Sequence, residues 1–562
     1  MQVEAMGRTI PAPPDFPVEW EKPEDVHAFW ERELQHVPKQ ATALEWDLQT
    51  RLIENGFNVA FEAQELPVRN AYRRFNTYVY QCIAPISHDP EVLEELGRRA
   101  EARTGETLAR LLEIWETESL PEIKESIAYW ESFDLRGAGD RELVAHLDET
   151  VRRFERAWDI HFRTVLPALM GMSLFDDFYR EVFGGDDAFA ALRLLQGLDN
   201  LSLEADRELY RLSRKAAASP AVLAAFERST PEEGVAELES TPDGRAFLAD
   251  LGAYLERYGK RHDGYISWTE PSWIENPLPV LTNLRDYLAR TDRDPDAELA
   301  ALAAERERLV AEARRLLEGR PPELRGQFEF LLKAGQEGNI IQENHNFWID
   351  GWVNHEVRQV LLEAGRRLAA HGLTDERDDV FHLIVDEIRD ALGGGAGTDL
   401  KQRVAERKGE LARWAHVHAP PVLGTFPPGP PPDDPVARAV FKMFGGIPKE
   451  PAQANEVTGM PGSPGIARGT ARIIHSLAEA HRLEAGDVLV TETTSPPWTP
   501  LFATVAAVVT DTGGILSHAA VVAREYMIPA VLGTKRATGV IRDGQLVEVD
   551  GNEGIVRILG SE

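Results

Sequence analysis

A run of prolines divides this sequence into two parts with different patterns. Residues 419–435 read APPVLGTFPPGPPPDDP and hold eight prolines. Proline has no backbone N–H, and its ring clashes with the preceding helical turn, so such a run cannot continue a helix and favours a stiff, extended tether. The sequence therefore predicts a domain over residues 1–418, a proline-rich linker over 419–440 and a second domain over 441–562.

The part before the linker carries mainly helical periodicity. In WVNHEVRQVLLEAGRRLAAHG, residues 352–372, apolar side chains recur every three or four positions, and Gly372 supplies a stop signal at the end. Few segments between residues 20 and 418 alternate in the manner of a strand. We therefore expect a large, mostly α-helical N-terminal domain.

The part after the linker has a different pattern. Short apolar runs such as GDVLVTE, TVAAVVTD and GQLVEVDG are separated by glycine and aspartate turns, which is typical of strands. Two helices are expected among them, one beginning near Pro500 and one at about Ser517. The pattern predicts a small, compact C-terminal α/β domain.

Composition excludes several classes of function. The chain has 562 residues, a formal net charge of −32 and a single cysteine, Cys82. This charge disfavours binding to nucleic acid, and one cysteine allows neither a disulfide framework nor a thiolate metal site. The sequence has no signal-peptide pattern at its start and no apolar stretch long enough for a membrane span, so we expect a soluble, cytoplasmic protein.

His518 is the main candidate for chemistry. It follows a predicted buried strand and the pair Gly513 and Gly514, which permit a sharp turn and leave room for a ligand. A helix beginning near Ser517 would leave its first N–H groups without helical partners, and these could bind phosphate, with Arg524 as a second contact. There the helix dipole favours a neutral, nucleophilic imidazole. Taken alone, the histidine is more simply explained by a hydrogen bond to a neighbouring loop.

A longer match favours the chemical interpretation. GGILSHAAVVAREYMIPAV resembles the phosphohistidine signature of the swivelling domain in the PEP-utilising enzymes, and the resemblance extends from Gly459 to Ile558. It implies that His518 accepts a phosphoryl group at one site and delivers it at another. Pyruvate-using members usually have threonine two residues before the histidine. Leu516 at that position suggests an organic hydroxyl acceptor instead.

Three stretches of the helical part resemble the acceptor-binding part of rifamycin phosphotransferases and the corresponding subunit of phenylphosphate synthase. They are VEWEKPEDVHAFWERELQHVP, RYGKRHDGYISWTEPSWIENP and the segment that begins QENHNFWIDGWVNHEV. The glycine-rich ATP-grasp domain of that family is not evident in the first 418 residues. The resemblance therefore implies a separate ATP-grasp-type subunit that uses ATP with Mg²⁺.

The third stretch supplies the candidate acceptor site. Glu343 and His345 are candidate bases for a hydroxyl acceptor. Rifamycin phosphotransferases tend to carry arginine and lysine where this sequence has Gln342 and Asn346, which puts a shared acceptor in doubt. A polar helix face exposed at a domain border is an equally open interpretation. The remaining acceptor-site candidates are Asp350 and Trp348, and other aromatic residues that could line an apolar pocket are Trp268, Trp273, Phe347 and Trp352.

Two further sets of polar residues are expected to have structural rather than chemical roles. Arg261, His262 and Asp263 could contact phosphate, but a salt bridge in a loop is the favoured interpretation. His36 is expected to be an ordinary histidine at a helix end.

The sequence thus predicts a dikinase-type phosphotransferase component. A partner would cleave ATP and phosphorylate His518, and a small hydroxylated, possibly aromatic, molecule would then receive the phosphoryl group. By resemblance the other products would be AMP and inorganic phosphate. The alternative is a non-enzymatic phosphocarrier or regulatory protein whose helical domain docks another protein.

Overall fold

The computed structural model describes residues 7–185, 187–228, 231–262, 268–289, 294–395, 399–417, 419–427, 434–446 and 448–560. The chain forms two compact units, each built from separated segments. The first unit comprises Met1–Pro167, Tyr265–Thr269 and Trp348–Ala437. The second comprises Ala168–Gly264, Glu270–Phe347 and Arg438–Glu562.

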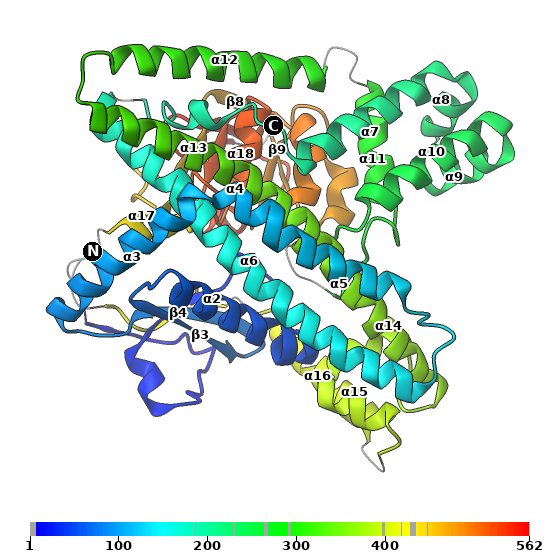
Figure 1. The fold of residues 1–562 in the computed structure, drawn as a ribbon. Coiled ribbons are helices and arrows are strands. Elements are labelled where there is room, and N and C mark those ends of the chain that lie inside the picture. The colour runs from blue at the N-terminus through cyan, green and yellow to red at the C-terminus, as the bar shows by residue number, and fades with distance from the viewer. Residues whose placement is uncertain are drawn as a thin grey trace. The chain divides into compact units, whose positions relative to one another are not determined.

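The first unit is mostly helical (Figure 1). The long helix α6 begins in this unit and ends in the second, with Pro167 inside it. The helices are η1 (Pro23–His27), η2 (Glu45–Thr50), α2 (Arg51–Ala63), α3 (Pro90–Ala109), α4 (Leu111–Ile114), η3 (Trp115–Ser119), α5 (Leu120–Ser132), α6 (Asp140–Phe183), α14 (Asn354–Ala370), η6 (Arg377–His382), α15 (Val385–Leu392) and α16 (Leu400–Trp414).

A five-stranded antiparallel sheet in this unit was not expected from the sequence. Its order is β1-β5-β2-β4-β3, and β5 joins β2 although nearly the whole helical part of the chain lies between them in sequence. One face packs around Trp30, Tyr80 and Leu423, all almost fully buried. The strands are β1 (Thr9–Ile10), β2 (Phe29–Arg32), β3 (Val68–Phe75), β4 (Tyr78–Pro85) and β5 (Val422–Thr425).

The predicted linker is therefore partly built into the folded structure rather than being a tether throughout. Val422–Thr425 is strand β5, and the hydroxyl of Tyr80 donates to the carbonyl of Pro420 at 2.7 Å. At the other end of the proline run, Pro435–Phe444 forms helix α17. Residues 428–433 lie outside the described residues. The prolines interrupt the preceding helices as expected, but they flank β5 rather than stand inside it, so they remove no hydrogen bond from the ladder.

The second unit contains the end of α6 and the helices from η4 to α13 (Figure 1). Among the described residues, no helix is both long enough and apolar enough to cross a membrane. The helices are η4 (Leu192–Leu195), α7 (Leu201–Ala218), α8 (Pro220–Phe226), α9 (Pro231–Ser240), α10 (Pro242–Tyr258), α11 (Leu278–Ala289), α12 (Pro295–Leu316) and α13 (Pro322–His345). The π-helical segment η5 (Asn346–Val353) follows, and from Trp348 onward it belongs to the first unit.

The C-terminal part of the second unit contains an eight-stranded sheet in the order β6-β13-β12-β8-β9-β10-β11-β7. Strands β8, β9, β10 and β11 are parallel neighbours, and the other pairs are antiparallel. The strands are β6 (Glu456–Thr458), β7 (Met460–Ser463), β8 (Ile466–Ile473), β9 (Val488–Thr491), β10 (Ala507–Thr510), β11 (Ala530–Leu532), β12 (Leu546–Asp550) and β13 (Ile555–Gly560).

Four short helices complete this α/β part: η7 (Leu477–Arg482), η8 (Pro496–Ala503), α18 (His518–Glu525) and α19 (Ala537–Val540). All the strands named from the sequence are present, and the helices expected near Pro500 and Ser517 correspond to η8 and α18. The predicted fold class, a large helical part followed by a small α/β part, is confirmed. The exact domain boundaries stay a prediction.

Candidate active site

His518 begins helix α18 at the carboxyl end of the parallel strand β10. The backbone of Ser517 is extended, with φ −70° and ψ 161°, and it forms the N-cap. The imidazole side chain is only 1% exposed. Ligand sites in parallel sheets cluster at this edge, beyond the carboxyl ends of the strands. The predicted helix start is confirmed, and it places His518 where ligands usually bind.

The two glycines before His518 are required for different reasons. Gly513 has φ +90°, a left-handed conformation that a side chain would strain. Gly514 has an ordinary backbone, but a Cβ there would lie 2.4 Å from the carbonyl oxygen of Lys442. The close neighbour of Gly514 is therefore the backbone of α17, rather than the ligand expected from the sequence.

Helix α17 holds this loop in place. The N–H groups of Gly514 and Leu516 donate to the carbonyls of Met443 and Lys442, at 2.8 and 2.9 Å. The Lys442 ammonium group, which is mostly buried, contacts both Asp176 and Asp177 near the end of α6, at 2.8 and 2.7 Å. The residues after the proline run thus anchor the histidine loop to the helices of the same unit.

Glu343 of α13 lies directly against His518. Its Oε1 is 3.2 Å from His518 Nδ1, and both side chains are at most 2% exposed. On the other side of the ring, Nε2 is 3.5 Å from Thr499 Oγ1. An imidazole that donates Nδ1–H to a carboxylate keeps the lone pair of its neutral form on Nε2. The geometry therefore leaves Nε2 as the ring nitrogen that could act as a nucleophile.

The charge state of Glu343 follows from the same contact. Burial would raise the pKa of this carboxyl, but the charge of His518 and the hydrogen bond from it act in the opposite direction, helped by the Ser202 hydroxyl. The net result is a pKa below the ordinary value. Glu343 is thus an ionised carboxylate that orients the histidine.

Two of the predicted phosphate-binding residues support the loop itself. Ser517 Oγ donates to the carbonyl of Gly514 at 2.8 Å. Arg524 Nη1 donates to the carbonyls of Ile515 and Gly462, at 2.8 and 2.9 Å, and burial lowers the pKa of this guanidinium group to about 10. Both residues shape the loop in this structure, and their contacts to phosphate stay predictions.

The far end of α18 packs on the helices of the second unit. The Gly197 N–H donates to Glu525 Oε1 at 3.1 Å, and burial raises the pKa of this carboxyl to about 7. The next residue, Tyr526, donates its hydroxyl to Asp206. These contacts fix the direction of α18 and so the position of His518.

The predicted acceptor residues on α13 are buried. Gln342, Glu343, His345 and Asn346 are each at most 4% exposed, so the interpretation as an exposed polar face is wrong. Asn346 Nδ2 donates to the Gln342 carbonyl at 2.7 Å, and His345 Nδ1 lies 3.0 Å from the Ile341 carbonyl. The side-chain oxygens of Gln342 and Asn346 have no hydrogen-bond partner among the described residues.

The remaining acceptor candidates belong to the first unit. Asp350 Oδ1 is 3.0 Å from His161 Nδ1 of α6. Trp348 stacks on Trp352, with ring centroids 5.2 Å apart, and Lys124 lies over its ring. Both aromatic rings come from η5, where π-helical turns replace the α-helical spacing assumed from the sequence.

The other polar candidates have mixed outcomes. Arg261 donates to the Leu201 carbonyl at 3.3 Å, and its guanidinium carbon lies 5.0 Å from the Phe347 ring centroid, so its described contacts are not those of a loop salt bridge. His36 is not at a helix end but follows β2, where its Nδ1 contacts Glu33 at 3.0 Å. Asp263 lies outside the described residues.

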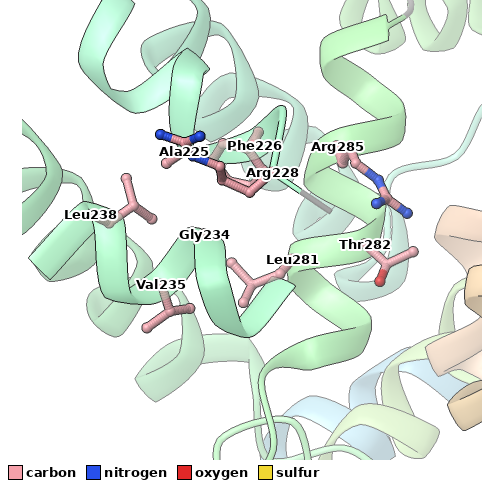
Figure 2. Close-up of a pocket in the computed structure, with 9 residues that line it drawn as sticks. All are labelled: Ala225, Phe226, Arg228, Gly234, Val235, Leu238, Leu281, Thr282 and Arg285. Atoms are coloured by element: carbon pink, nitrogen blue, oxygen red, sulfur yellow. The ribbon is translucent and has the colours of Figure 1, made fainter. Parts of the chain in front are cut away.

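A separate hollow contains none of the predicted site residues. It lies among α8, α9 and α11, where Figure 2 shows two arginines beside apolar side chains. One of these arginines, Arg228, is paired with Glu237. The hollow is lined by Ala225, Phe226, Arg228, Gly234, Val235, Leu238, Leu281, Thr282 and Arg285.

Two family models match this chain. The model for the fourth domain of rifampicin phosphotransferase matches residues 161–343, and the model for the mobile domain of PEP-utilising enzymes matches residues 483–554. The first match ends at Glu343 and the second contains His518. The two members of the buried pair thus come from the two matched regions.

Curated relatives agree with these models. Chondramide synthase cmdD of Chondromyces crocatus is 39% identical over 98% of this chain. The phosphotransferase YvkC of Bacillus subtilis is 34% identical over 72%, and rifampicin phosphotransferase of Streptomyces sviceus is 29% identical over 84%. The chain spans 14%, 47% and 50% of the lengths of these relatives, respectively. Two regions of the chain are thus similar to domains of PEP-utilising enzymes, and its relatives include rifampicin phosphotransferases.

Proposed function

We propose that this chain is the phosphoryl-carrying and acceptor-binding part of an ATP-dependent phosphotransferase, in which His518 is the covalent carrier. The observation that carries the proposal is the buried pair of His518 and Glu343, with 3.2 Å between Nδ1 and Oε1. The pair fixes the ring and leaves Nε2 for attack on phosphorus. The match to the mobile domain of PEP-utilising enzymes supports the same role.

The first step loads the histidine. Nε2 of His518 attacks phosphorus of the nucleotide-derived donor, the N–P bond forms, and the P–O bond to the leaving group breaks. The positive charge that develops on the imidazole lies beside the ionised Glu343 carboxylate, which stabilises it. The start of α18, whose first N–H groups have no partner within the helix, is the part of the backbone that would bind the new phosphoryl oxygens.

The second step transfers the phosphoryl group to a small hydroxylated molecule. The acceptor oxygen attacks phosphorus, the N–P bond breaks, and the hydroxyl proton passes to a base on α13. Glu343 and His345 are the candidates from the sequence. Glu343 accepts from Nδ1 of His518, on the side of the ring away from Nε2, which favours His345 as the base. As in other phosphoryl transfers, positioning and charge stabilisation supply most of the acceleration.

The buried amides on α13 support recognition of a neutral hydroxyl compound. The side-chain oxygens of Gln342 and Asn346 lack partners among the described residues, and a buried acceptor atom without a donor is destabilising. A ligand hydroxyl could supply that donor. Trp348 and Asp350 stay acceptor contacts predicted from the sequence, and the aromatic residues of this stretch suggest an aromatic or similarly bulky acceptor.

The donor in this proposal is an ATP-grasp-type domain that binds ATP with Mg²⁺. We predict from the sequence that it is a separate cytoplasmic subunit. The matched relatives are much longer than this chain, so the same domain could instead lie on a longer polypeptide. The names of the relatives include a synthase and phosphotransferases, so we do not assign the acceptor from any one of them.

The test combines the protein with a candidate ATP-grasp partner and ATP labelled at the β position. We expect acid-labile label on the wild-type chain and none on the His518→Ala variant. Equal labelling of the two proteins would contradict the proposal, as would the lack of label with every partner tested. Label that no hydroxyl compound discharges, but that passes to a second protein, would favour the phosphocarrier alternative.

A further inference from the structure

The segment after strand β9 lies against the histidine loop. Strands β9 and β10 are parallel neighbours, with Thr491 opposite Thr510, so the segments that follow them leave the same edge of the sheet. The backbone N–H and the hydroxyl of Thr512 both donate to the Glu492 carbonyl at 3.0 Å. Further along, Thr499 Oγ1 reaches to 3.5 Å from His518 Nε2. This segment therefore borders the nucleophilic side of the ring.

Ser495 in this segment has a hydroxyl that its own helix cannot use. It is the N-cap of η8, and an N-cap serine normally accepts hydrogen bonds from the second and third backbone N–H groups of the helix. Here Pro496 and Pro497 occupy the first two positions and have no N–H. The next N–H, of Trp498, donates to the Ser495 carbonyl at 2.8 Å.

Thr494, the preceding residue, is also buried. Thr494 is 3% exposed and Ser495 is 1% exposed. In the part of the chain that the structure describes, neither Thr494 Oγ1 nor Ser495 Oγ has a hydrogen-bond partner. Native proteins seldom leave two adjacent buried hydroxyl groups unsatisfied, and such groups commonly mark a site for a ligand.

We infer that Thr494 and Ser495 form a hydroxyl cradle that donates hydrogen bonds to the phosphoryl oxygens carried on His518 Nε2, beside Thr499. This inference rests on the proposed function, because it names further residues that bind the phosphoryl group of the same carrier. A hydroxyl donates to a dianionic phosphoryl oxygen without adding charge, and such charge-assisted hydrogen bonds are short and strong. The TTSPPWT segment, which follows the neighbouring strand β9, thus binds the phosphoryl group on His518.

The cradle can be tested with phosphoramidate, a small chemical donor that needs no nucleotide-binding partner. Nε2 attacks phosphorus, the P–N bond of the reagent breaks, and ammonia leaves, while His518 keeps the proton on Nδ1. The full chain would be compared in four forms: wild type, His518→Ala, the double variant Thr494→Val with Ser495→Ala, and Thr493→Val. Mass spectrometry of peptides would give the rate of phosphorylation at residue 518.

Thr493→Val is the matched control, because it removes a neighbouring, only partly buried threonine hydroxyl. A fifth form, Thr494→Ser, keeps a hydroxyl and should retain most of the wild-type rate, which separates loss of the donor from misfolding. Melting temperatures of all variants would be measured alongside. We expect the double variant to be phosphorylated at least roughly tenfold more slowly than wild type, as for loss of hydrogen bonds to a charged group.

The outcomes separate the two proposals. Equal rates for wild type and the double variant would overturn the cradle and leave the carrier role of His518 intact. Equal slowing by Thr493→Val would also overturn it, because the effect would not be specific to the two buried hydroxyls. Absence of phosphorylation at residue 518 in wild type would overturn the proposed function and the cradle with it.

Discussion

The two units each contain a buried histidine paired with a carboxylate. In the second unit His518 Nδ1 lies 3.2 Å from Glu343, and in the first unit His161 Nδ1 lies 3.0 Å from Asp350. All four side chains are at most 6% exposed. By pair geometry and burial alone, the two sites would be equally good candidates for histidine chemistry.

Their surroundings differ. His161 lies in the middle of α6, where its ring centroid is 4.6 Å from those of both Trp158 and Phe162. Burial, with a contribution from the charge of His36, holds the pKa of His161 well below its ordinary value. His518 instead starts a helix, after a glycine loop, and its Nε2 faces a threonine hydroxyl.

The comparison teaches that the pair itself does not identify a carrier histidine. The backbone around it does, because of these two histidines His518 begins a helix, after a glycine turn, where the first N–H groups have no partner within the helix. His161 belongs to a packed aromatic cluster, where a neutral imidazole fills space between rings. Three experiments would break or sharpen this distinction.

The largest effect is expected from the carboxylates. Glu343→Gln keeps the shape of the side chain but removes the charge that stabilises the imidazolium of phosphorylated His518, so phosphorylation should slow by about a hundredfold or more. The matched change in the other unit, Asp350→Asn, should leave the rate of phosphorylation within about twofold. Rapid-quench labelling of His518 would measure both, and equal slowing by the two variants would erase the distinction.

The next effect concerns the glycine loop. Gly514→Ala places a Cβ against the Lys442 carbonyl, which a backbone shift must relieve, so we expect a loss of about 1–3 kcal/mol in unfolding free energy. Gly539→Ala is the control, since a Cβ there meets no atom within 4 Å and α19 is helical. Denaturant titration would compare them, and an unchanged midpoint for Gly514→Ala would show that α17 does not hold the loop.

The smallest effect is a change in pH dependence at the other end of α18. The folded-state pKa of Glu525 is raised to about 7, so its contribution to stability is fully present below about pH 4.5 and is lost as the pH rises toward 7. Gln does not titrate and can still accept from the Gly197 N–H. We expect Glu525→Gln to flatten the fall in melting temperature between pH 5 and 8, and an unchanged slope would contradict this.

Much of this architecture follows from local sequence. The strands around TVAAVVTD, the glycine turn and the start of α18 are all encoded within a few residues of each other, so periodicity and turn chemistry predict them. The carrier role of His518 was inferred from a long signature in the same region. Glu343 was also named as a candidate, but from resemblance and helical spacing.

Other features depend on contacts that no local pattern encodes. Glu343 and His518 are 175 residues apart in sequence, so their hydrogen bond could not be read from either motif. Strand β5 lies inside the proline run and pairs with β2 far earlier in the chain, which hid the five-stranded sheet. The buried hydroxyls of Thr494 and Ser495, which lack hydrogen-bond partners among the described residues, become visible only in the folded structure.

The position of the phosphoryl group on the ring tests the central claim most directly. Phosphorylated protein labelled with ¹⁵N at its histidines would be examined by ¹H–¹⁵N and ³¹P NMR, with His518→Ala and His161→Gln as references. We expect one phosphohistidine, on Nε2 of His518, present in His161→Gln and absent from His518→Ala. A phosphoryl group on Nδ1 of His518, or on His161, would contradict the account.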